Sequence, residues 1–272
     1  MSRLDDTFAG LRARGETGLI TYITAGDPDL ERSAAVLGAL DRAGADVIEV
    51  GVPFSDPVAD GPVIERAAGR ARAAGGTLAS TLDLVAGVRA SIRAPLVLFS
   101  YLNPLLAMGE GTFAERAAAA GIDGVLVIDL PIEEADALRA TVASAGIDMI
   151  FLLSPTTSVQ RIRRAAALGR GFLYAISRLG VTGARDTLPE GAYELVTRIR
   201  AHTKLPVAVG FGLSTPEHVR QVGAWADAAV VGSALVGVVE SAAGQPDFVE
   251  RVEAYVHWLK GADPSSASMG HL

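Results

Sequence analysis

The sequence predicts an α/β fold, namely a closed (β/α)8 TIM barrel with an extra N-terminal helix and extra helices after strands 2 and 8. The first observation behind this prediction is a series of short, continuous apolar runs, which are typical of parallel strands buried on both faces. The second is that amphipathic stretches separate these runs, so that strand and helix alternate. Eight such units in a chain of 272 residues favour one barrel domain.

The strands are expected at residues 19–24, 46–50, 95–99, 124–128, 148–153, 171–176, 206–210 and 228–232. Four of them are introduced by a repeated motif, in which small residues lead to an aspartate: Asp46, Asp123, Asp148 and Asp227. In three of these motifs a glycine stands where the preceding helix ends, which suits a left-handed helix cap. The motif therefore marks junctions between a helix and the next strand.

Helices are expected at residues 30–42, 113–120, 133–144, 159–168, 193–202 and 216–222. The segment between strands 2 and 3 is long enough for two helices, interrupted at Gly75-Gly76. A short helix at residues 2–13 has Leu4, Phe8 and Leu11 on one face and is expected to cover one end of the barrel.

An open, doubly wound sheet is the competing fold. It would favour a glycine-rich turn after the first strand, and the segment Thr24-Ala25-Gly26-Asp27-Pro28 is not such a turn. Residues 1–260 are expected to form the single barrel domain. Residues 261–272 are small, polar and without periodicity, so we expect a disordered tail.

Composition excludes several classes of function. The formal net charge is −7 and basic residues are not interleaved with aromatic ones, so nucleic acid is not an expected partner. Cysteine is absent, which excludes disulfides and thiolate catalysis. The chain contains no apolar run near the roughly 18 residues of a membrane span and no apparent leader, so we expect a cytoplasmic protein without a membrane partner.

Carboxylates near the second strand are the first candidates for catalysis, because barrel enzymes carry their active sites at the carboxyl ends of the strands. Glu49 lies near the end of an apolar strand, where an unpaired carboxylate is costly to desolvate. We interpret Glu49 as the proton-transfer residue and Asp60 as a carboxylate that orients the substrate. The alternative is structural: Glu49 pairs with a buried partner, while Asp56 and Asp60 cap turns.

Small residues after the last three strands indicate a phosphate site. Gly183, Gly212 and Gly232-Ser233 would let backbone amides approach a ligand, and Ser214 and Ser233 stand where helices are expected to begin. Helix N-termini bind phosphate, and the loops after strands 7 and 8 are its usual place in barrels. The long loop between Arg178 and Gly191 is expected to act as a lid.

The predicted strand ends carry no lysine or histidine, which limits the kinds of reaction that the site could catalyse. Of the two lysines, Lys204 lies just before strand 7 and Lys260 lies near the C-terminus. Neither is placed to form a Schiff base with a substrate. The four histidines fall outside the strand ends, which argues against a transition-metal site. The remaining groups are carboxylates and Tyr174, which support general acid–base chemistry.

The segment Glu49-Val50-Gly51-Val52-Pro53-Phe54-Ser55-Asp56-Pro57-Val58-Ala59-Asp60-Gly61-Pro62 resembles the signature of the tryptophan synthase alpha chain family. Further stretches agree with that family in order and spacing: residues 24–28, 174–178, 180–183, 210–212 and 232–234. The resemblance covers roughly residues 1–260. One departure is Ser154-Pro155-Thr156-Thr157, where the family pattern is richer in proline and ends in asparagine or a similar residue.

This resemblance implies a retro-aldol cleavage of indole-3-glycerol phosphate to indole and glyceraldehyde 3-phosphate. It implies that Glu49 is the main acid–base residue, that Asp60 hydrogen-bonds the indole N–H, and that Tyr174 lies beside the reacting carbons. The phosphate would be held by backbone amides around Gly183, Phe211, Gly212, Gly232 and Ser233.

The resemblance also implies which loops move or meet a partner. The loop with Asp56 would meet a beta chain, and the lid that begins at Arg178 would close over the substrate, with Thr182 touching Asp60. The expected assembly is an α2β2 heterotetramer in which pyridoxal phosphate belongs to the beta chain and this chain holds no cofactor or metal.

The alternatives are another phosphate-binding barrel such as a sugar-phosphate isomerase or epimerase, a stand-alone indole-producing lyase, and a non-catalytic regulatory subunit.

Overall fold

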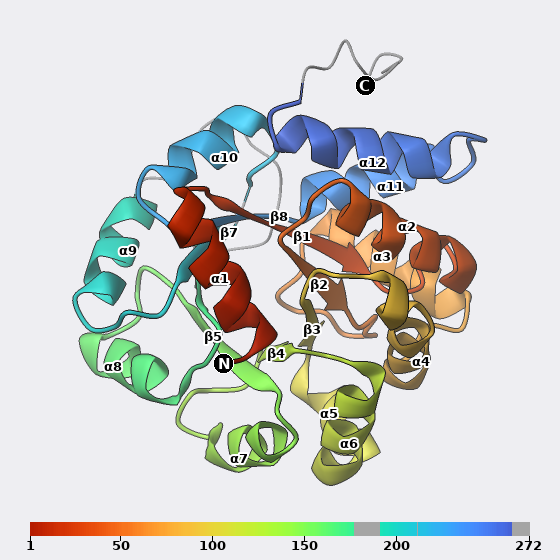
Figure 1. Ribbon diagram of the computed structural model, residues 1–272. Helices are drawn as coiled ribbons and strands as arrows, with labels where there is room; N and C mark the ends of the chain where they lie inside the picture. Colours follow the sequence, from red (N-terminus) through yellow and green to blue (C-terminus); the bar gives the residue numbers. More distant parts are fainter. Residues whose placement is uncertain (177–190, 211, 263–272) are drawn as a thin grey trace.

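A closed barrel of parallel strands forms the centre of the molecule, in a computed structural model that describes residues 1–176, 191–210 and 212–262. Within these residues eight strands follow one another around the barrel in sequence order, and β8 returns to pair with β1. Apart from α1, the helices form a ring outside the strands, as Figure 1 shows. The predicted (β/α)8 barrel is therefore confirmed.

The strands have the bounds β1 Gly18–Thr24, β2 Val47–Gly51, β3 Leu96–Ser100, β4 Gly124–Val127, β5 Asp148–Leu153, β6 Leu173–Ile176, β7 Val207–Gly210 and β8 Ala228–Val231. The predicted bounds differ from these by at most two residues. The apolar runs predicted the strands well because both faces of each strand are covered, one by the barrel interior and the other by helices.

The helices are α1 Arg3–Arg14, α2 Leu30–Arg42, α3 Pro62–Ala73, α4 Leu78–Val88, α5 Leu102–Met108, α6 Glu110–Ala120, α7 Asp136–Ser144, α8 Val159–Leu168, α9 Ala192–Arg200, α10 Pro216–Gly223, α11 Ser233–Ala242 and α12 Phe248–Leu259, with a 3₁₀ turn at Arg89–Ser91. The extra helices after strands 2 and 8 are thus α3 and α4, and α11 and α12.

One helix was not predicted, and two predicted helices begin three residues away from the expected start: α6 at Glu110 and not at residue 113, and α7 at Asp136 and not at residue 133. Helix α5 was not predicted; it lies directly after β3 and contains Pro104. Proline is tolerated in the first turn of a helix, where its missing N–H has no partner to lose, and Pro104 is the third residue of α5. The helix expected at residues 133–144 begins only at Asp136, after a series of turns.

Side chains alternate along each strand between the barrel interior and the helix layer. On β2, Ile48 and Val50 belong to the large apolar cluster shared with the helices, whereas Val47 belongs to the cluster inside the barrel. Glu49 has the same parity as Val47 and lines a cavity at the carboxyl end of the barrel. Glu49 therefore points into the barrel and not toward the helix layer.

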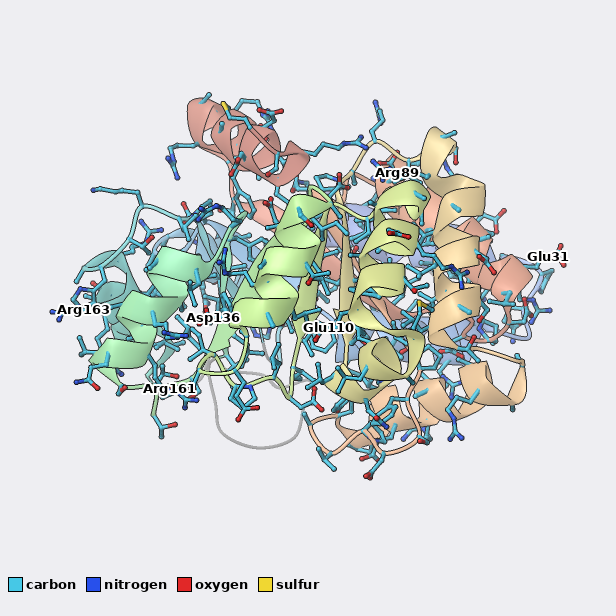
Figure 2. All side chains as sticks on the ribbon, turned by 90° about the horizontal axis from the view of Figure 1, so that it is seen from below. Glu31, Arg89, Glu110, Asp136, Arg161 and Arg163 are labelled. Atoms are coloured by element: carbon cyan, nitrogen blue, oxygen red, sulfur yellow. The ribbon has the colours of Figure 1, made fainter. Side chains whose placement is uncertain are left out.

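Helix α1 closes the opposite end of the barrel. Its apolar face, Leu4, Phe8 and Leu11, is buried among interior side chains, and the rings of Phe8 and Phe172 lie 5.6 Å apart between centroids. Figure 2 shows this helix lying across one end of the barrel, apart from the helices of the outer wall. The predicted covering role of residues 2–13 is confirmed.

The repeated aspartate motif has a structural role that the sequence did not reveal. The Asp46, Asp123 and Asp227 carboxylates accept hydrogen bonds from the first free amides of β1, β3 and β7, at Leu19, Leu96 and Val207. In return, the amide of each aspartate donates to the carbonyl of the same partner residue. Unpaired buried amides are costly, so these aspartates join neighbouring strands at the end of the barrel where the strands begin.

No helix among the described residues is long and apolar enough to cross a membrane. The predicted tail lies almost wholly outside the described residues, which stop at residue 262.

Candidate active site

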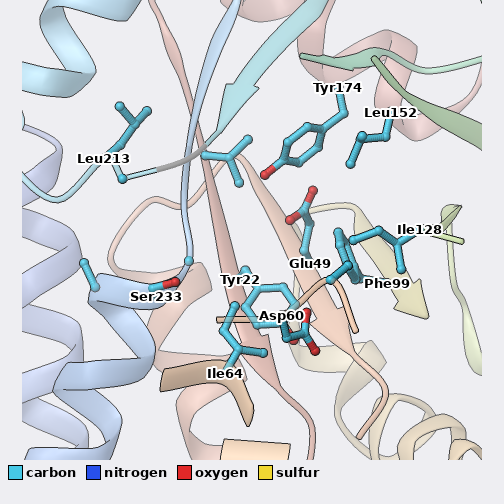
Figure 3. Close-up of a pocket in the computed structure, with 15 residues that line it drawn as sticks. Tyr22, Glu49, Asp60, Ile64, Phe99, Ile128, Leu152, Tyr174, Leu213 and Ser233 are labelled. Carbon is cyan, nitrogen blue, oxygen red and sulfur yellow. The ribbon is translucent and has the colours of Figure 1, made fainter. Parts of the chain in front are cut away.

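The carboxyl ends of the strands surround a cavity. Residues that the sequence singled out line it together: Glu49, Asp60, Tyr174, Gly212, Gly232 and Ser233. The other lining residues had no predicted role and are mostly apolar: Tyr22, Ala59, Ile64, Phe99, Ile128, Leu152, Leu213, Val230 and Ala234. Figure 3 shows the Glu49 carboxylate near the middle of this cavity, with Ser233 and Leu213 on one side and Phe99 and Ile128 on the other.

Glu49 is buried, and among the described residues it forms no ion pair. It pairs in register with Tyr22 on β1 and with Val97 on β3, and only 1% of its surface is exposed. Among the described residues its Oε1 atom has no hydrogen-bond partner. Burial raises the pKa of Glu49 to about 8, because water no longer solvates the charged form. The structural alternative, a buried partner for Glu49, is not supported within the described part of the chain.

Asp60 enters the cavity from the loop between β2 and α3. The hydroxyl of Tyr101 donates a hydrogen bond to the Asp60 carboxylate and accepts one from the amide of Ala59, with an N···O distance of 3.0 Å. Tyr101 in turn stacks on Phe54, with ring centroids 4.9 Å apart. The sequence did not reveal this support, because Tyr101 follows β3 and lies 41 residues from Asp60.

The electrostatics of Asp60 differ from those of Glu49. Burial is the largest cause that raises the pKa of Asp60, the nearby Glu65 adds to it, and the hydrogen bond from Tyr101 opposes both, which leaves the pKa at about 6. At pH 7 Glu49 is therefore mostly protonated and Asp60 mostly ionised. A pair of carboxylates whose pKa values are pushed apart in this way can divide acid and base roles.

Tyr174 and Tyr22 occupy equivalent places on β6 and β1. Both are buried, and burial raises the pKa of each hydroxyl above its usual range. Figure 3 shows the Tyr174 hydroxyl and the Glu49 carboxylate pointing toward each other. Tyr22 was not predicted as a site residue, although it lies two residues before the end of β1 and on the same face of the sheet as Glu49.

Glycines on the next strand make room for both tyrosine rings. A Cβ atom at Gly51 would lie 2.2 Å from the Tyr22 hydroxyl oxygen, and one at Gly210 would lie 2.1 Å from that of Tyr174. Side chains at these two positions would therefore force the tyrosines out of their observed places.

We expect Gly210→Ala to lower the free energy of unfolding by about 1–3 kcal/mol, the usual cost of overpacking. Gly69→Ala is the matched control, because Gly69 lies exposed in α3 with nothing within 4 Å of a Cβ atom. Alanine is the better helix former, so this control should gain up to about 1 kcal/mol. Chemical denaturation of both variants measures the two effects. Equal stability of Gly210→Ala and the parent chain would show that Tyr174 moves without cost.

The rim opposite Phe99 is built from backbone. Gly212 has φ +76°, in the left-handed region that favours glycine, and Gly232 is the N-cap of α11 without a side-chain cap hydrogen bond. The first amides of α11, at Ser233 and Ala234, therefore border the cavity. Amides at a helix N-terminus carry partial positive charge and suit an anionic group.

Ser214 does not begin a helix, contrary to the prediction. The N-cap of α10 is Thr215, whose hydroxyl accepts from the amide of His218. Ser214 instead donates its amide to Nδ1 of His218 and accepts at its carbonyl from the Tyr255 hydroxyl, 2.8 Å away. It therefore belongs to a packing arrangement between β7 and α12 and does not line the cavity.

Several predicted residues lie away from the cavity or outside the described residues. Asp56 is exposed on the loop before Asp60. The predicted lid residues Arg178 and Thr182, and the predicted phosphate contacts Gly183 and Phe211, fall outside the described residues. Among the residues that are described, no group of three or more His, Cys, Asp or Glu side chains could hold a metal ion.

The unusual loop after β5 is a closed turn. The hydroxyl of Thr157 accepts from the amide of Ser154, and Arg198 of α9 donates to the carbonyls of Pro155 and Thr157. The loop borders a second, more polar hollow outside the cavity, lined also by Asp129 and Arg161. The four residues that depart from the family pattern therefore do not line the cavity.

Comparisons with known proteins match most of the chain. The family model of the tryptophan synthase alpha chain matches residues 8–263. A tryptophan synthase alpha chain from Citrifermentans bemidjiense is 48% identical over 260 residues, which cover 96% of this chain and 97% of the relative. Another from Geobacter sulfurreducens is 50% identical over 240 residues, covering 88% of this chain and 91% of the relative.

Solved structures give the same result. Tryptophan synthase subunit alpha from Legionella pneumophila superposes with a TM-score of 0.88 at 37% identity, covering 96% of this chain and 97% of the other. A chain from the tryptophan synthase α2β2 complex of Pyrococcus furiosus superposes with a TM-score of 0.84 at 38% identity, covering 90% of this chain and 98% of the other.

Proposed function

Because this chain belongs to the tryptophan synthase alpha chain family, we propose that its cavity cleaves indole-3-glycerol phosphate into indole and D-glyceraldehyde 3-phosphate. As a member of this family the chain is a lyase. The observation that carries the proposal is that two carboxylates of different acidity share one cavity with an uncapped helix N-terminus.

Glu49 is the proton donor in this proposal. With a pKa of about 8 it is protonated at neutral pH, so it can deliver a proton to C3 of the indole ring. The ring nitrogen then becomes positively charged and can accept electrons. When the bond between C3 and the glycerol chain breaks, its electron pair returns to the ring and restores indole.

The same step forms an aldehyde from the glycerol chain. The hydroxyl on the carbon that leaves C3 must lose its proton, and the Glu49 carboxylate, ionised after the first transfer, is the base within the cavity. The proton count then balances: one proton moves to C3 and one returns to Glu49. Tyr174, whose hydroxyl points toward Glu49, is proposed to lie beside the reacting carbons.

Asp60 stabilises the charge that develops on the ring. Its pKa of about 6 leaves it ionised at neutral pH, where it can accept a hydrogen bond from the indole N–H. A fixed carboxylate beside a developing positive charge in a cavity with mostly apolar walls favours the protonated ring over the starting indole. The apolar walls at Ile64, Phe99 and Ile128 suit the ring itself.

The phosphate end of the substrate is proposed to bind at the opposite rim. Gly212, Gly232 and Ser233 would supply backbone amides there, with the dipole of α11 behind them. Gly183 and Phe211 are proposed to complete this site, as the family resemblance implies. Arg178 and Thr182 belong to the proposed lid.

The activity should have a bell-shaped dependence on pH. Asp60 must be ionised and Glu49 protonated, so kcat/KM should rise as pH passes about 6 and fall as pH passes about 8. A pH series of kcat/KM on the isolated chain measures both limbs. Glu49→Asp provides a check, because a shifted alkaline limb would assign that limb to residue 49. An alkaline limb that stays unchanged would contradict the assignment.

A beta chain is the proposed partner, in an α2β2 heterotetramer like the Pyrococcus furiosus complex. Two exposed apolar side chains support this proposal: Val58 on the loop with Asp56 and Leu106 on α5 are 75% and 51% exposed. Pyridoxal phosphate would belong to the beta chain, which would receive the indole. We also propose a cytoplasmic location, where phosphorylated intermediates of biosynthesis are held.

The direct test is incubation of the purified chain with indole-3-glycerol phosphate while indole is measured. Indole release alone and faster release with a beta chain are the expected results. An unchanged substrate, with and without the beta chain, would reject the proposed reaction and favour a regulatory role. Release that no beta chain accelerates, together with no co-purification, would favour a stand-alone lyase.

A further inference from the structure

Two helices carry the two ends of the proposed substrate site. Helix α3 begins at Pro62, directly after Asp60 and Gly61, and its residue Ile64 lines the cavity. Helix α11 begins at Ser233, on the rim proposed for phosphate. The relative placement of these helices therefore sets the distance between Asp60 and the phosphate rim. Figure 1 shows α3 and α11 as neighbours on one side of the barrel.

Near the cavity, apolar packing joins the two helices. Ile64 and Ala67 of α3 form a buried cluster with Val236 of α11 and Tyr22 of β1. This contact is close to the first turn of each helix. Because this contact lies toward the cavity end of the helix pair, a second contact farther along would help to fix the angle between the helices.

A charged cluster supplies that second contact near the last turn of each helix. The Arg70 guanidinium donates to both oxygens of Asp27, at 2.8 and 2.9 Å, and its third nitrogen donates to Glu240 at 2.7 Å. Arg66 donates to both oxygens of Glu240, at 2.9 and 2.8 Å. We call Asp27, Arg70 and Glu240 the α3–α11 clamp.

The clamp is built more firmly than a surface ion pair. The Asp27 side chain is only 2% exposed, and it lies in the turn after β1, so the clamp also ties α3 to the barrel wall. Hydrogen bonds from Arg66 are the largest cause that lowers the pKa of Glu240, to about 2, so Glu240 stays charged throughout the working range. Bidentate arginine–carboxylate pairs fix orientation as well as distance.

We propose that Asp27, Arg70 and Glu240 are positioning residues, which hold Asp60 and the N-terminus of α11 at the separation that the substrate spans. The clamp touches neither the substrate nor the reacting atoms. It acts by keeping α3 and α11 from pivoting about their apolar contact. This inference rests on the proposed function, because it takes Asp60 and the α11 rim as the two ends of the substrate site.

Two probes separate positioning from general stability. Indole-3-propanol phosphate has the ring, the three-carbon chain and the phosphate, but it lacks the hydroxyls and is not cleaved. It must reach both ends of the site. Glycerol 3-phosphate reaches only the phosphate rim. A looser clamp should weaken the binding of indole-3-propanol phosphate and leave the binding of glycerol 3-phosphate unchanged.

We expect Asp27→Asn to raise the Kd of indole-3-propanol phosphate by about tenfold. A misplacement of about 1 Å can slow a reaction about 10²-fold, and we expect a smaller effect on binding. Glu240→Gln should act in the same direction with a smaller effect, and its 31% exposed side chain lets the variant fold even where Asp27→Asn does not. Both variants should bind glycerol 3-phosphate within about twofold of the parent chain. Calorimetric titration measures all four constants.

Glu253→Gln is the matched control. Glu253 of α12 pairs with Arg42 of α2 at 2.6 Å and is 26% exposed, so it resembles Glu240 but lies on helices that do not begin at the cavity. The Glu253→Gln variant should bind both probes with the Kd of the parent chain. The inference would be overturned if the clamp variants lost affinity equally for both probes, or if they lost affinity for neither. If the parent chain itself fails to bind indole-3-propanol phosphate, the proposed function fails and the inference with it.

Discussion

Glu49→Gln is expected to slow indole release from indole-3-glycerol phosphate by about 10²–10⁴-fold, the usual contribution of a positioned acid or base. Glutamine keeps the shape of the side chain but cannot deliver a proton to C3 or take one from the glycerol hydroxyl. Because the lost interaction acts in the transition state, kcat should fall while KM changes little. Single-turnover measurement of indole gives the chemical step directly. Turnover like that of the parent chain would remove Glu49 from the mechanism.

The same variant should be more stable than the parent chain at alkaline pH, which shows that lost activity is not lost folding. The folded state raises the pKa of Glu49 from 4.5 to about 8, so the parent chain loses stability as pH rises between these values. Glutamine does not titrate and escapes this loss. The gain should be small at pH 4.5 and on the order of a few kcal/mol at pH 8. Thermal unfolding at both pH values measures it.

Asp60→Asn is expected to slow the reaction by about 10²–10³-fold, by analogy with the removal of one preorganised group that stabilises transition-state charge. Asparagine fills the same space and can still accept a hydrogen bond from the indole N–H, but it carries no negative charge to oppose the charge on the ring nitrogen. Steady-state assays with indole-3-glycerol phosphate measure the effect.

Asp56→Asn is the matched control, because Asp56 lies in the same loop but is exposed and outside the cavity. It should leave the isolated chain's activity unchanged. Tyr101→Phe should lie between the two, since it removes the hydrogen bond to Asp60 but keeps the carboxylate and the stacking on Phe54. If Asp60→Asn impaired only the response to a beta chain, Asp60 would be an interface residue.

Much of the architecture could be predicted because its signals are local. Each apolar run is a strand whose two buried faces demand apolar side chains, and Leu4, Phe8 and Leu11 recur with the period of a helix. Glu49, Asp60 and the glycines at 212 and 232 could be identified because a family signature and strand-end positions mark them. Helix α5 was not predicted. Its Pro104 would disrupt the interior of a helix, but it lies in the first turn, where proline is tolerated.

Other features depended on residues that lie far apart in the sequence. Nothing near Asp60 predicts Tyr101 as its support, and nothing near Asp27 predicts its pairing with Arg70 and Glu240. The aspartate repeat is a pattern in the sequence, but its role depends on contacts between strands: Asp123 accepts a hydrogen bond from the amide of Leu96 on the neighbouring strand. Register between strands decides such contacts.

The sequence alone determined the order of strands and helices, the family, and the residue types available for acid–base chemistry, because these depend on local periodicity and on which side chains are present. Only the tertiary structure decided which way Glu49 points, since an all-apolar strand around it carries no alternation that marks the inner face. It also decided the acidity of Glu49 and Asp60. A pKa depends on burial and on neighbours brought together by closure of the barrel, and closure is a property of the whole chain.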